Sequence, residues 1–442
     1  MSSLQIARDA VSMADRSSEG VYESPTINCD GCSHRETAVN VGRHKIKLGV
    51  VIGSMQRGGT EMQLAQLLPR LKKNGITIAV FIMGPTGPVA DDLRNSDISV
   101  IEVAVPKGLS RVPTLLRRLL RTFWAVPQFL AFALRHRHGI LHLYLSEAVI
   151  SGGLLTVWWH KRVIVSQRGL ITYRHKYPLI VTALERYVFR NCRAVLANSE
   201  SVRRALQVDG LEREIGLIYN GIGPERLDPL NAEREAVRAE LNLAPDEWVL
   251  VVLANLHPYK GHADLIEALI RLKAEDALPA RWRLILIGRD IGTDSAEVEP
   301  DSKTSWRSHL QEICRAHDLD SQVLFLGERK DGVRLLRAAD IGVLPSHEES
   351  FSNALLEMMG AGLAIIATDV GGNAEALGGE AGLIVPAQDP GALMQALQRF
   401  QDQRLRAVYG AKARRRVEIE FSLETCMQEH LDFYQSLMRC KE

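Results

Sequence analysis

Short apolar runs alternate with amphipathic segments along most of the chain, and this alternation predicts the fold class. In the first half, runs typical of buried strands occupy residues 46–53, 76–83, 99–105, 139–145, 163–166, 194–198 and 216–219. The segments between them place apolar residues at helical spacing, most clearly over residues 58–71, 112–137 and 177–189. Strands that alternate with helices form parallel βαβ units, so we expect an α/β fold with a doubly wound sheet.

A stretch rich in Gly, Pro, Asn and Asp interrupts the alternation at residues 220–231, as a linker would. The pattern then restarts, with strands expected at residues 248–254, 283–288, 323–326, 340–344, 364–368 and 381–386, and helices at 261–273, 306–317, 332–338, 353–359 and 390–400. The polar segment 291–305 has no period and is expected to be a surface insertion. We therefore predict two Rossmann-like domains, residues 45–222 and 223–420, and a C-terminal helix at 421–442 that packs back on the first domain.

Residues 1–44 are polar and show no sustained period, so we interpret them as a disordered or loosely attached extension. They contain Cys29 and Cys32 in a C-x-x-C with His34 nearby, which could be half of a zinc site, but a structural site needs four ligands and no second C-x-x-C follows. Six scattered cysteines favour a reducing cytoplasm over a disulfide-built secreted protein. We see neither a signal-peptide pattern at the start nor an apolar run long enough for a spanning helix.

Composition is that of an ordinary globular protein, with 46% hydrophobic and 24% charged residues, and this excludes collagen, coiled coil and gross disorder for the whole chain. Lys and Arg number 54 against 53 Asp and Glu, so nothing indicates a nucleic-acid partner. The charge is nevertheless uneven, because residues 101–190 hold 14 basic and three acidic residues. Within them, Arg111–Arg137 is basic and aromatic together; it is either a helix on an anionic membrane surface or a buried domain helix with solvated ends.

The most informative stretch for chemistry is PSHEESFSNALLE, residues 345–357. Glu349 falls in the loop after an expected strand, and Glu357 falls inside the helix that follows. Between them, residues 350–353 would present free backbone N–H groups at a helix N-terminus, which attracts anions. Carboxylates accept from sugar hydroxyls and amides donate to phosphate, so this pairing suits a nucleotide sugar; a capped surface helix with two solvated acids is the plainer alternative.

Three further features lie at the carboxyl ends of expected strands, where doubly wound sheets bind ligands. Lys260 can pair with a diphosphate, Gly58 and Gly59 open a helix, and the segment 369–375 has two adjacent glycines that allow close backbone approach. A solvated lysine and ordinary turns would explain the same residues. Neither G-x-G-x-x-G nor the P-loop motif occurs, which disfavours a dinucleotide dehydrogenase or a P-loop kinase.

In their joint order these features resemble the retaining glycosyltransferases of family 4, which have the GT-B fold of two Rossmann-like domains facing across a cleft. The resemblance covers about residues 46–435 and is more specific in the second half. The matching motifs are Gly58-Gly59, ANSES (197–201), YNGI (219–222), Lys260-Gly261, LIGRD (286–290), FLGERKD (325–331), PSHEESFSNALLE and TDVGGNAE (368–375).

The resemblance implies a role for each matching residue. Lys260 would bind the donor diphosphate, Glu357 the ribose hydroxyls, and Glu349 the transferred sugar near the reacting centre. The backbone amides of Ser350, Phe351 and Ser352 would meet sugar and phosphate. Gly58 and Gly59 would line the cleft from the other domain.

Two positions depart from the family pattern. Asn255 stands where the family usually has an arginine, so one phosphate contact is missing or comes from Arg289 or His257. The family often has a histidine after the strand at 163–166, where this chain reads SQRG; Arg168 or His142 could take that role.

The implied reaction is attack of an acceptor hydroxyl on the donor sugar with net retention, and it needs no metal or other cofactor. Asp318 and Asp320 form a D-x-D that we interpret as helix-end and loop chemistry. The acceptor would be a glycan or lipid-linked saccharide in polysaccharide or lipopolysaccharide biosynthesis, and the protein cytoplasmic or peripheral on the inner membrane face. The alternatives are a nucleotide-sugar epimerase or hydrolase of the same fold, and a non-catalytic transferase-like subunit.

Overall fold

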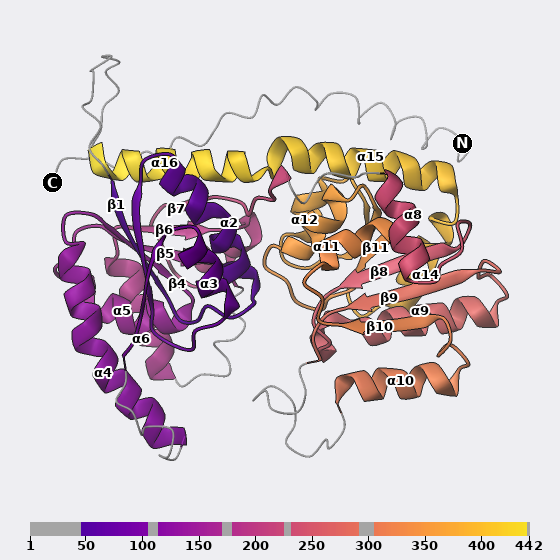
Figure 1. Cartoon of the computed structure of the whole chain (residues 1–442), viewed down its shortest axis with the longest axis horizontal. Coiled ribbons are helices and arrows are strands. Elements are labelled where there is room, and N and C mark those ends of the chain that lie inside the picture. The colour runs from indigo at the N-terminus through magenta and orange to yellow at the C-terminus, as the bar shows by residue number, and fades with distance from the viewer. Residues whose placement is uncertain (1–45, 105–113, 170–178, 225–230, 291–304, 440–442) are drawn as a thin grey trace, which may run out of the picture. The chain divides into compact units, whose positions relative to one another are not determined.

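The computed structural model describes residues 46–104, 114–169, 179–224, 231–290 and 305–439 (Figure 1). Several sequence predictions lie outside these residues: the extension 1–44 with Cys29 and Cys32, nearly all of the insertion 291–305, and the start of Arg111–Arg137. For residues 114–122 of that helix only the backbone is described.

The first sheet has seven parallel strands in the order β3-β2-β1-β4-β5-β6-β7. Its strands are β1 (Lys47–Ile52), β2 (Thr77–Ile82), β3 (Ser99–Glu102), β4 (Ile140–Tyr144), β5 (Val163–Gln167), β6 (Ala194–Ala197) and β7 (Ile215–Leu217). The helices between them are α2 (Gly59–Lys73), α3 (Pro88–Asn95), α4 (Thr114–Arg135), α5 (Ser146–Thr156), α6 (Leu179–Asn191) and α7 (Glu200–Val208). Right-handed crossovers put α2 and α3 on one face of this sheet and α4 to α7 on the other.

The second sheet has six parallel strands in the order β10-β9-β8-β11-β12-β13. Its strands are β8 (Trp248–Leu253), β9 (Trp282–Ile287), β10 (Val323–Gly327), β11 (Ile341–Leu344), β12 (Ala364–Thr368) and β13 (Leu383–Val385). The α-helices are α8 (Asn231–Glu240), α9 (His262–Ala274), α10 (Trp306–Ala316), α11 (Gly332–Leu335), α12 (Asn353–Gly360), α13 (Asn373–Leu377) and α14 (Pro390–Arg399), and two 3₁₀ turns are η4 (Pro258–Lys260) and η5 (Leu336–Ala338).

The predicted α/β class with two doubly wound sheets is confirmed, and every strand expected over the described residues is present. The strand order reverses between β1 and β4 in the first sheet and between β8 and β11 in the second. Such switch points leave a crevice at the carboxyl ends of the strands. The segments that carry Lys260 and Glu349 follow β8 and β11, so the topology brings both to one crevice.

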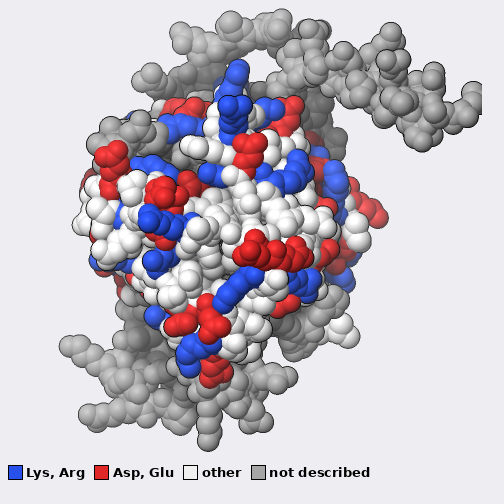
Figure 2. Space-filling model, turned by 90° about the vertical axis from the view of Figure 1, so that its right-hand side faces the viewer, with Lys and Arg blue, Asp and Glu red and all other residues white. Residues whose placement is uncertain are grey.

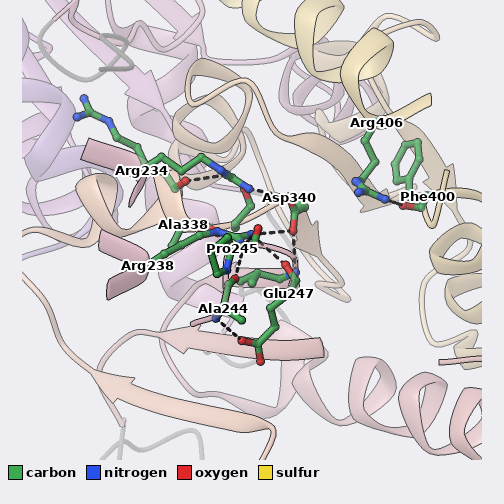
Figure 3. A network of polar contacts seen from close by, with 12 residues as sticks. Arg234, Arg238, Ala244, Pro245, Glu247, Ala338, Asp340, Phe400 and Arg406 are labelled. Carbon is green, nitrogen blue, oxygen red and sulfur yellow. Dashed lines mark hydrogen bonds and ion pairs between the residues drawn. The ribbon is translucent and has the colours of Figure 1, made fainter. Parts of the chain in front are cut away.

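The amino-terminal ends of β8 and β11, opposite the crevice, are held by a partly buried polar network around Asp340 (Figure 3). The Asp340 carboxylate accepts hydrogen bonds from Arg234 at 2.7 Å, from Arg238 at 3.1 Å and from the Val249 backbone N–H at 2.8 Å. Arg238 is only 5% exposed and also donates to carbonyls of neighbouring loops. This network anchors α8 beneath the sheet, away from the crevice.

The chain passes between the two domains at two neighbouring points. The Ile222 N–H donates to the Phe421 carbonyl, and the Leu423 N–H donates to the Ile222 carbonyl, each at 2.9 Å. On one side of this crossing α15 (Gln403–Glu420) packs against α12 and β12, and on the other α16 (Leu423–Arg439) packs against α2. Both helices are yellow in Figure 1.

Candidate active site

A pocket of about 1410 Å³, partly open to solvent, lies at the carboxyl ends of β8, β9 and β11 and at the start of α2. Eight of the residues predicted from the sequence to form the site line it together: Gly58, Gly59, Asn255, Lys260, Arg289, Glu349, Ser352 and Glu357. They come from segments up to 300 positions apart, so only the fold unites them. Ser350, Phe351, Arg168 and His142 are not among the described residues that line this pocket.

Lys260 and Glu349 contact each other. The Lys260 Nζ lies 2.6 Å from Glu349 Oε1, and the hydroxyl of the fully buried Ser346 donates to the same oxygen at 2.8 Å. Burial disfavours the ammonium charge, but the attraction of Glu349 outweighs it and raises the pKa of Lys260 above its usual value. Lys260 is thus protonated, and its positive charge at the crevice is balanced by the negative charge of Glu349.

The N-terminus of α12 faces the same pocket. Ser352 caps the helix by accepting a hydrogen bond from the Leu355 N–H at 3.3 Å, and Asn353 ties it to α2 by donating to the Gly59 carbonyl at 2.8 Å. Glu357 lies about one turn further along, where its carboxylate borders the pocket. The helix N-terminus and Lys260 can bind an anion. The Glu357 carboxylate beside them can accept hydrogen bonds from hydroxyl groups of the same ligand.

Ser350 and Phe351 anchor the loop before α12 instead of facing the pocket with their side chains. The Ser350 hydroxyl donates to the Arg168 carbonyl at 2.8 Å. The Phe351 ring is 4% exposed and packs against the rings of Tyr219 and Phe421, with centroids 5.1 and 5.4 Å away. The role predicted for these two residues concerns their backbone amides, and it remains a prediction.

Asn255, which stands where the resembling family usually has an arginine, has a structural role. Asn255 Oδ1 accepts the backbone N–H of Arg289 at 3.1 Å, which fixes the segment after β9 next to that after β8. The Arg289 side chain is exposed at the pocket and forms no ion pair within the part of the chain that the structure describes. The Arg289 guanidinium therefore lies near the position at which the family arginine is missing.

Sequence reasoning missed other charged residues that line the pocket, among them Arg57, Glu328, Arg329 and Lys330. Arg57 forms an ion pair with Glu328 at 3.4 Å, and Arg329 pairs with Asp331 at 2.8 Å. The sequence offered a signal for them, since Arg57 directly precedes Gly58 and the other three belong to the FLGERKD motif after β10.

Gly58 and Gly59 at the start of α2 border the pocket, but the Glu61 carboxylate lies close to the backbone amides there. Glu61, 6% exposed, accepts from the Ser54 hydroxyl at 2.8 Å. A Cβ placed on Gly58 would come within 2.4 Å of Glu61 Oε2, so the carboxylate folds back on the helix start. Burial raises the pKa of Glu61. This end of α2 is thus less open to a phosphate than the end of α12.

His142 and Arg168 belong to a polar core between β4, β5 and α16. His142 is fully buried, with Nδ1 at 2.8 Å from the Tyr434 hydroxyl and Nε2 at 2.7 Å from the Ser166 hydroxyl. Burial holds the pKa of His142 well below its usual value, so the ring is neutral. The Arg168 guanidinium donates to Asn220 Oδ1 and lies 6.0 Å from the centre of the Tyr144 ring.

Within the described ranges no group of three or more His, Cys, Asp or Glu side chains could hold a metal ion. Asp318 of the D-x-D is almost fully exposed and lies near Lys273. None of the described helices combines the length and hydrophobicity that crossing a bilayer demands.

Comparison with known proteins gives consistent matches across both domains. A family described as Glycosyltransferase Family 4 matches residues 57–226, and one described as Glycosyl transferases group 1 matches residues 247–403. The lipopolysaccharide core biosynthesis mannosyltransferase LpsB of Rhizobium meliloti is 30% identical over 264 residues, which are 58% of this chain and 70% of that protein. A D-inositol 3-phosphate glycosyltransferase of Nocardia farcinica is 30% identical over 228 residues, about half of each chain.

Among solved structures, HepE of Anabaena in complex with UDP superposes with a TM-score of 0.72 at 20% identity. The match covers 88% of this chain and all of that one. It therefore spans both sheets and the crevice that carries Lys260 and Glu349.

Proposed function

Because the chain belongs to glycosyltransferase family 4 and has the GT-B fold, we propose that it is a retaining enzyme that moves a hexose from a nucleotide sugar to a hydroxyl of a glycan or lipid-linked acceptor. The observation that carries the proposal is the meeting of Lys260, Glu349, Glu357 and the α12 N-terminus in one pocket. The UDP in the HepE complex supports a nucleotide donor, and the name of LpsB supports a setting in lipopolysaccharide or polysaccharide synthesis.

In the proposed reaction, the donor diphosphate replaces Glu349 as the ion-pair partner of Lys260. It also accepts hydrogen bonds from the backbone N–H groups at the start of α12. Glu357 accepts hydrogen bonds from the ribose hydroxyls. Glu349, released from Lys260, faces the transferred sugar. These groups are in place before the charge develops, which is the arrangement that electrostatic catalysis requires.

The acceptor hydroxyl then attacks the anomeric carbon from the face that the diphosphate leaves. The bond from this carbon to the phosphate oxygen breaks as the bond to the acceptor oxygen forms, and the acceptor proton passes to the leaving diphosphate. Lys260 and the α12 amides stabilise the negative charge of the leaving group. We propose that no metal is needed, so activity should persist in the presence of a chelator.

Arg289 is the residue we propose for the phosphate contact that Asn255 does not supply, since its exposed side chain borders the pocket. His257 stays the alternative. For the role of the family histidine we favour Arg168 over His142, because the Arg168 carbonyl accepts a hydrogen bond from Ser350 in the loop that leads from β11 to α12.

The proposal is tested by incubating the protein with UDP-, GDP- and ADP-sugars, with and without saccharide acceptors, and analysing the products. Transfer that requires an acceptor supports it. Donor turnover of equal rate without acceptor would indicate an epimerase or hydrolase instead. Nucleotide binding without turnover on any acceptor would indicate a non-catalytic subunit.

We further propose that the α4 to α7 side of the first domain contacts an anionic membrane surface, which would bring a lipid-linked acceptor to the enzyme. Nine of the twelve large hydrophobic side chains that are exposed among the described residues lie on or next to these helices. They are Phe123, Trp124, Leu134, Trp158, Leu179, Ile180, Leu184, Tyr187 and Val208. Aromatic side chains with basic neighbours are typical of peripheral membrane contacts.

Positive charge supports the same surface. A shallow pocket at the amino-terminal ends of β5, β6 and β7 is lined by His160, Lys161, Arg190, Arg193 and Arg213, and no acidic residue is among the described residues that line it. By contrast, basic and acidic side chains are mixed on the face shown in Figure 2. Binding to vesicles of phosphatidylglycerol in a sedimentation assay should fall at least tenfold in a Trp158→Ala, Lys161→Glu variant, while Val408→Ala, Lys412→Glu on α15 should bind as the wild type does.

A further inference from the structure

The loop that carries Glu349 is pressed against the turn that carries Lys260. The backbone N–H of His347 donates to the Tyr259 carbonyl at 2.7 Å. Gly261, with φ of +68°, lies so close that a Cβ there would fall 1.9 Å from the Pro345 carbonyl oxygen. The two segments follow different strands, β11 and β8, so this contact is where the two halves of the site are joined.

A side-chain bridge crosses the same junction. His347 Nε2 lies 2.7 Å from Asp264 Oδ2 in the first turn of α9, and His347 Nδ1 lies 3.3 Å from Gln388 Nε2. An amide nitrogen can only donate, so Nδ1 accepts and the ring proton sits on Nε2, where it is donated to the carboxylate. The first turn of a helix also favours the negative charge of Asp264.

We propose that His347 and Asp264 are positioning residues for donor binding. Neither is among the described residues that line the pocket, yet His347 is two positions from Glu349 and Asp264 is four positions from Lys260. The bridge holds the loop against the turn, so that the Lys260 ammonium group and the α12 N-terminus face one diphosphate together. This inference rests on the proposed function, because it concerns how the same pocket is kept ready for its donor.

The hydrogen bond between His347 and Asp264 is sheltered and strong enough to hold the loop of Glu349 in one position. The His347 and Asp264 side chains are 23% and 20% exposed, so water competes only in part for their hydrogen bond. A hydrogen bond to a carboxylate is stronger than one between neutral groups. Losing it would let the loop sample other positions, and displacements of about 1 Å are enough to weaken a preorganised site.

The sharpest test compares two isosteric replacements of the histidine. In His347→Gln the side-chain amide nitrogen reaches the position of Nε2 and can still donate to Asp264, whereas in His347→Asn it reaches only the position of Nδ1. Both remove the imidazole. Affinities for UDP, GDP and ADP are measured by calorimetry. We expect the Asn variant to bind its nucleotide about tenfold more weakly than the wild type, and the Gln variant to stay within about twofold.

Asp264→Ala gives a second route to the same interaction. It should also weaken binding about tenfold, and the double variant His347→Asn, Asp264→Ala should be no weaker than either single variant, since both break one bridge. Glu267→Ala, one turn along α9 on the exposed side where it pairs with Arg271, is the matched control and should bind as the wild type does. Hydrogen exchange of the ligand-free chain should speed up at residues 257–261 and 345–350 in the Asn variant alone among the two histidine replacements.

The outcomes separate the bridge from the proposed function. If the wild type binds none of the three nucleotides, the proposed function fails and the inference fails with it. If the wild type binds but the Asn and Gln variants are equal, or additive effects appear in the double variant, the bridge has no positioning role and the proposed function stands.

Discussion

The contact between Lys260 and Glu349 indicates what a ligand must supply when it binds at this site. Each was predicted to bind part of the donor, and the structure pairs them with each other at 2.6 Å. A buried ion pair is costly to leave half-empty, because the remaining charge loses its partner. A donor phosphate that replaces Glu349 at Lys260 must therefore leave that carboxylate with a new hydrogen-bond donor, and the hydroxyls of a sugar are suited to supply it.

The two glutamates of the PSHEESFSNALLE motif should separate in their kinetic effects. Glu357→Ala should raise the dissociation constant for the nucleotide roughly tenfold, since a hydrogen bond to a charged group contributes about 1.5–3 kcal/mol. Glu349→Ala should instead lower kcat without weakening nucleotide binding, because the phosphate no longer has to displace this carboxylate from Lys260. Both are measured by titration calorimetry and steady-state kinetics. Glu348→Ala, at the exposed neighbouring position, is the control; equal losses of affinity in the two variants would contradict the roles proposed.

At the scale of elements, the alternation of strands and helices was sufficient to predict both sheets, but it did not single out three of the helices. Helix α3 is short and begins at Pro88, α13 has five residues, and α8 is so rich in charge that it resembles a linker. The position of α8 depends on Asp340, about a hundred residues away, which binds Arg234 and Arg238. Local periodicity cannot reveal an anchor of that kind.

The turn after η4 should tolerate no side chain at Gly261. Gly261→Ala adds a Cβ that meets the Pro345 carbonyl, in addition to the strain of a positive φ, so the free energy of unfolding should fall by about 2–4 kcal/mol. Gly362 is the matched control, because it has φ of +74° with nothing within 4 Å of its added Cβ. Gly362→Ala should cost only about 1 kcal/mol. Urea denaturation measures both, and similar losses would show that the contact with Pro345 is unimportant.

At the scale of the whole molecule, buried neutral histidines should make the protein sensitive to acid. Burial lowers the pKa of His262 to about 3 and that of His430 to about 4, and holds that of His142 well below the usual value. The unfolded chain binds protons at these residues near pH 6.5 and the folded chain does not, so stability is complete above that pH and is lost as the pH falls below it.

The test compares unfolding free energies from urea denaturation at pH 7 and pH 5. His430→Gln cannot titrate, so its loss of stability between these values should be smaller than that of the wild type by roughly 2 kcal/mol. His317→Gln at an exposed position should lose as much as the wild type. An unchanged pH dependence in His430→Gln would mean that this histidine is not kept neutral by the fold.

The sequence predicted which residues of the second domain meet at the pocket better than it predicted the surroundings of His142 and Arg168 in the first domain. Lys260, Glu349, Ser352 and Glu357 follow strands in motifs with fixed spacing, so they could be found before the fold was known. The surroundings of His142 and Arg168 could not, because they depend on α16, which adds Tyr434 and the C-terminal part of the chain to a core built from β4 and β5. Pairing across such a distance leaves no local trace.

The double crossing at Ile222 and Phe421–Leu423 makes the domain of the second sheet an insertion within the domain of the first. Both of its ends leave from adjacent backbone positions, so the domain can be treated as a cassette with a single attachment point. A chimaera that exchanges residues 223–420 for those of a relative would cut the backbone only at this junction, but it would have to keep the contacts that Glu328, Ser350 and Asn353 make with the first domain. Under the proposed function, exchange of this one segment would change the choice of donor while the surface that the first domain offers to the acceptor stays as it is.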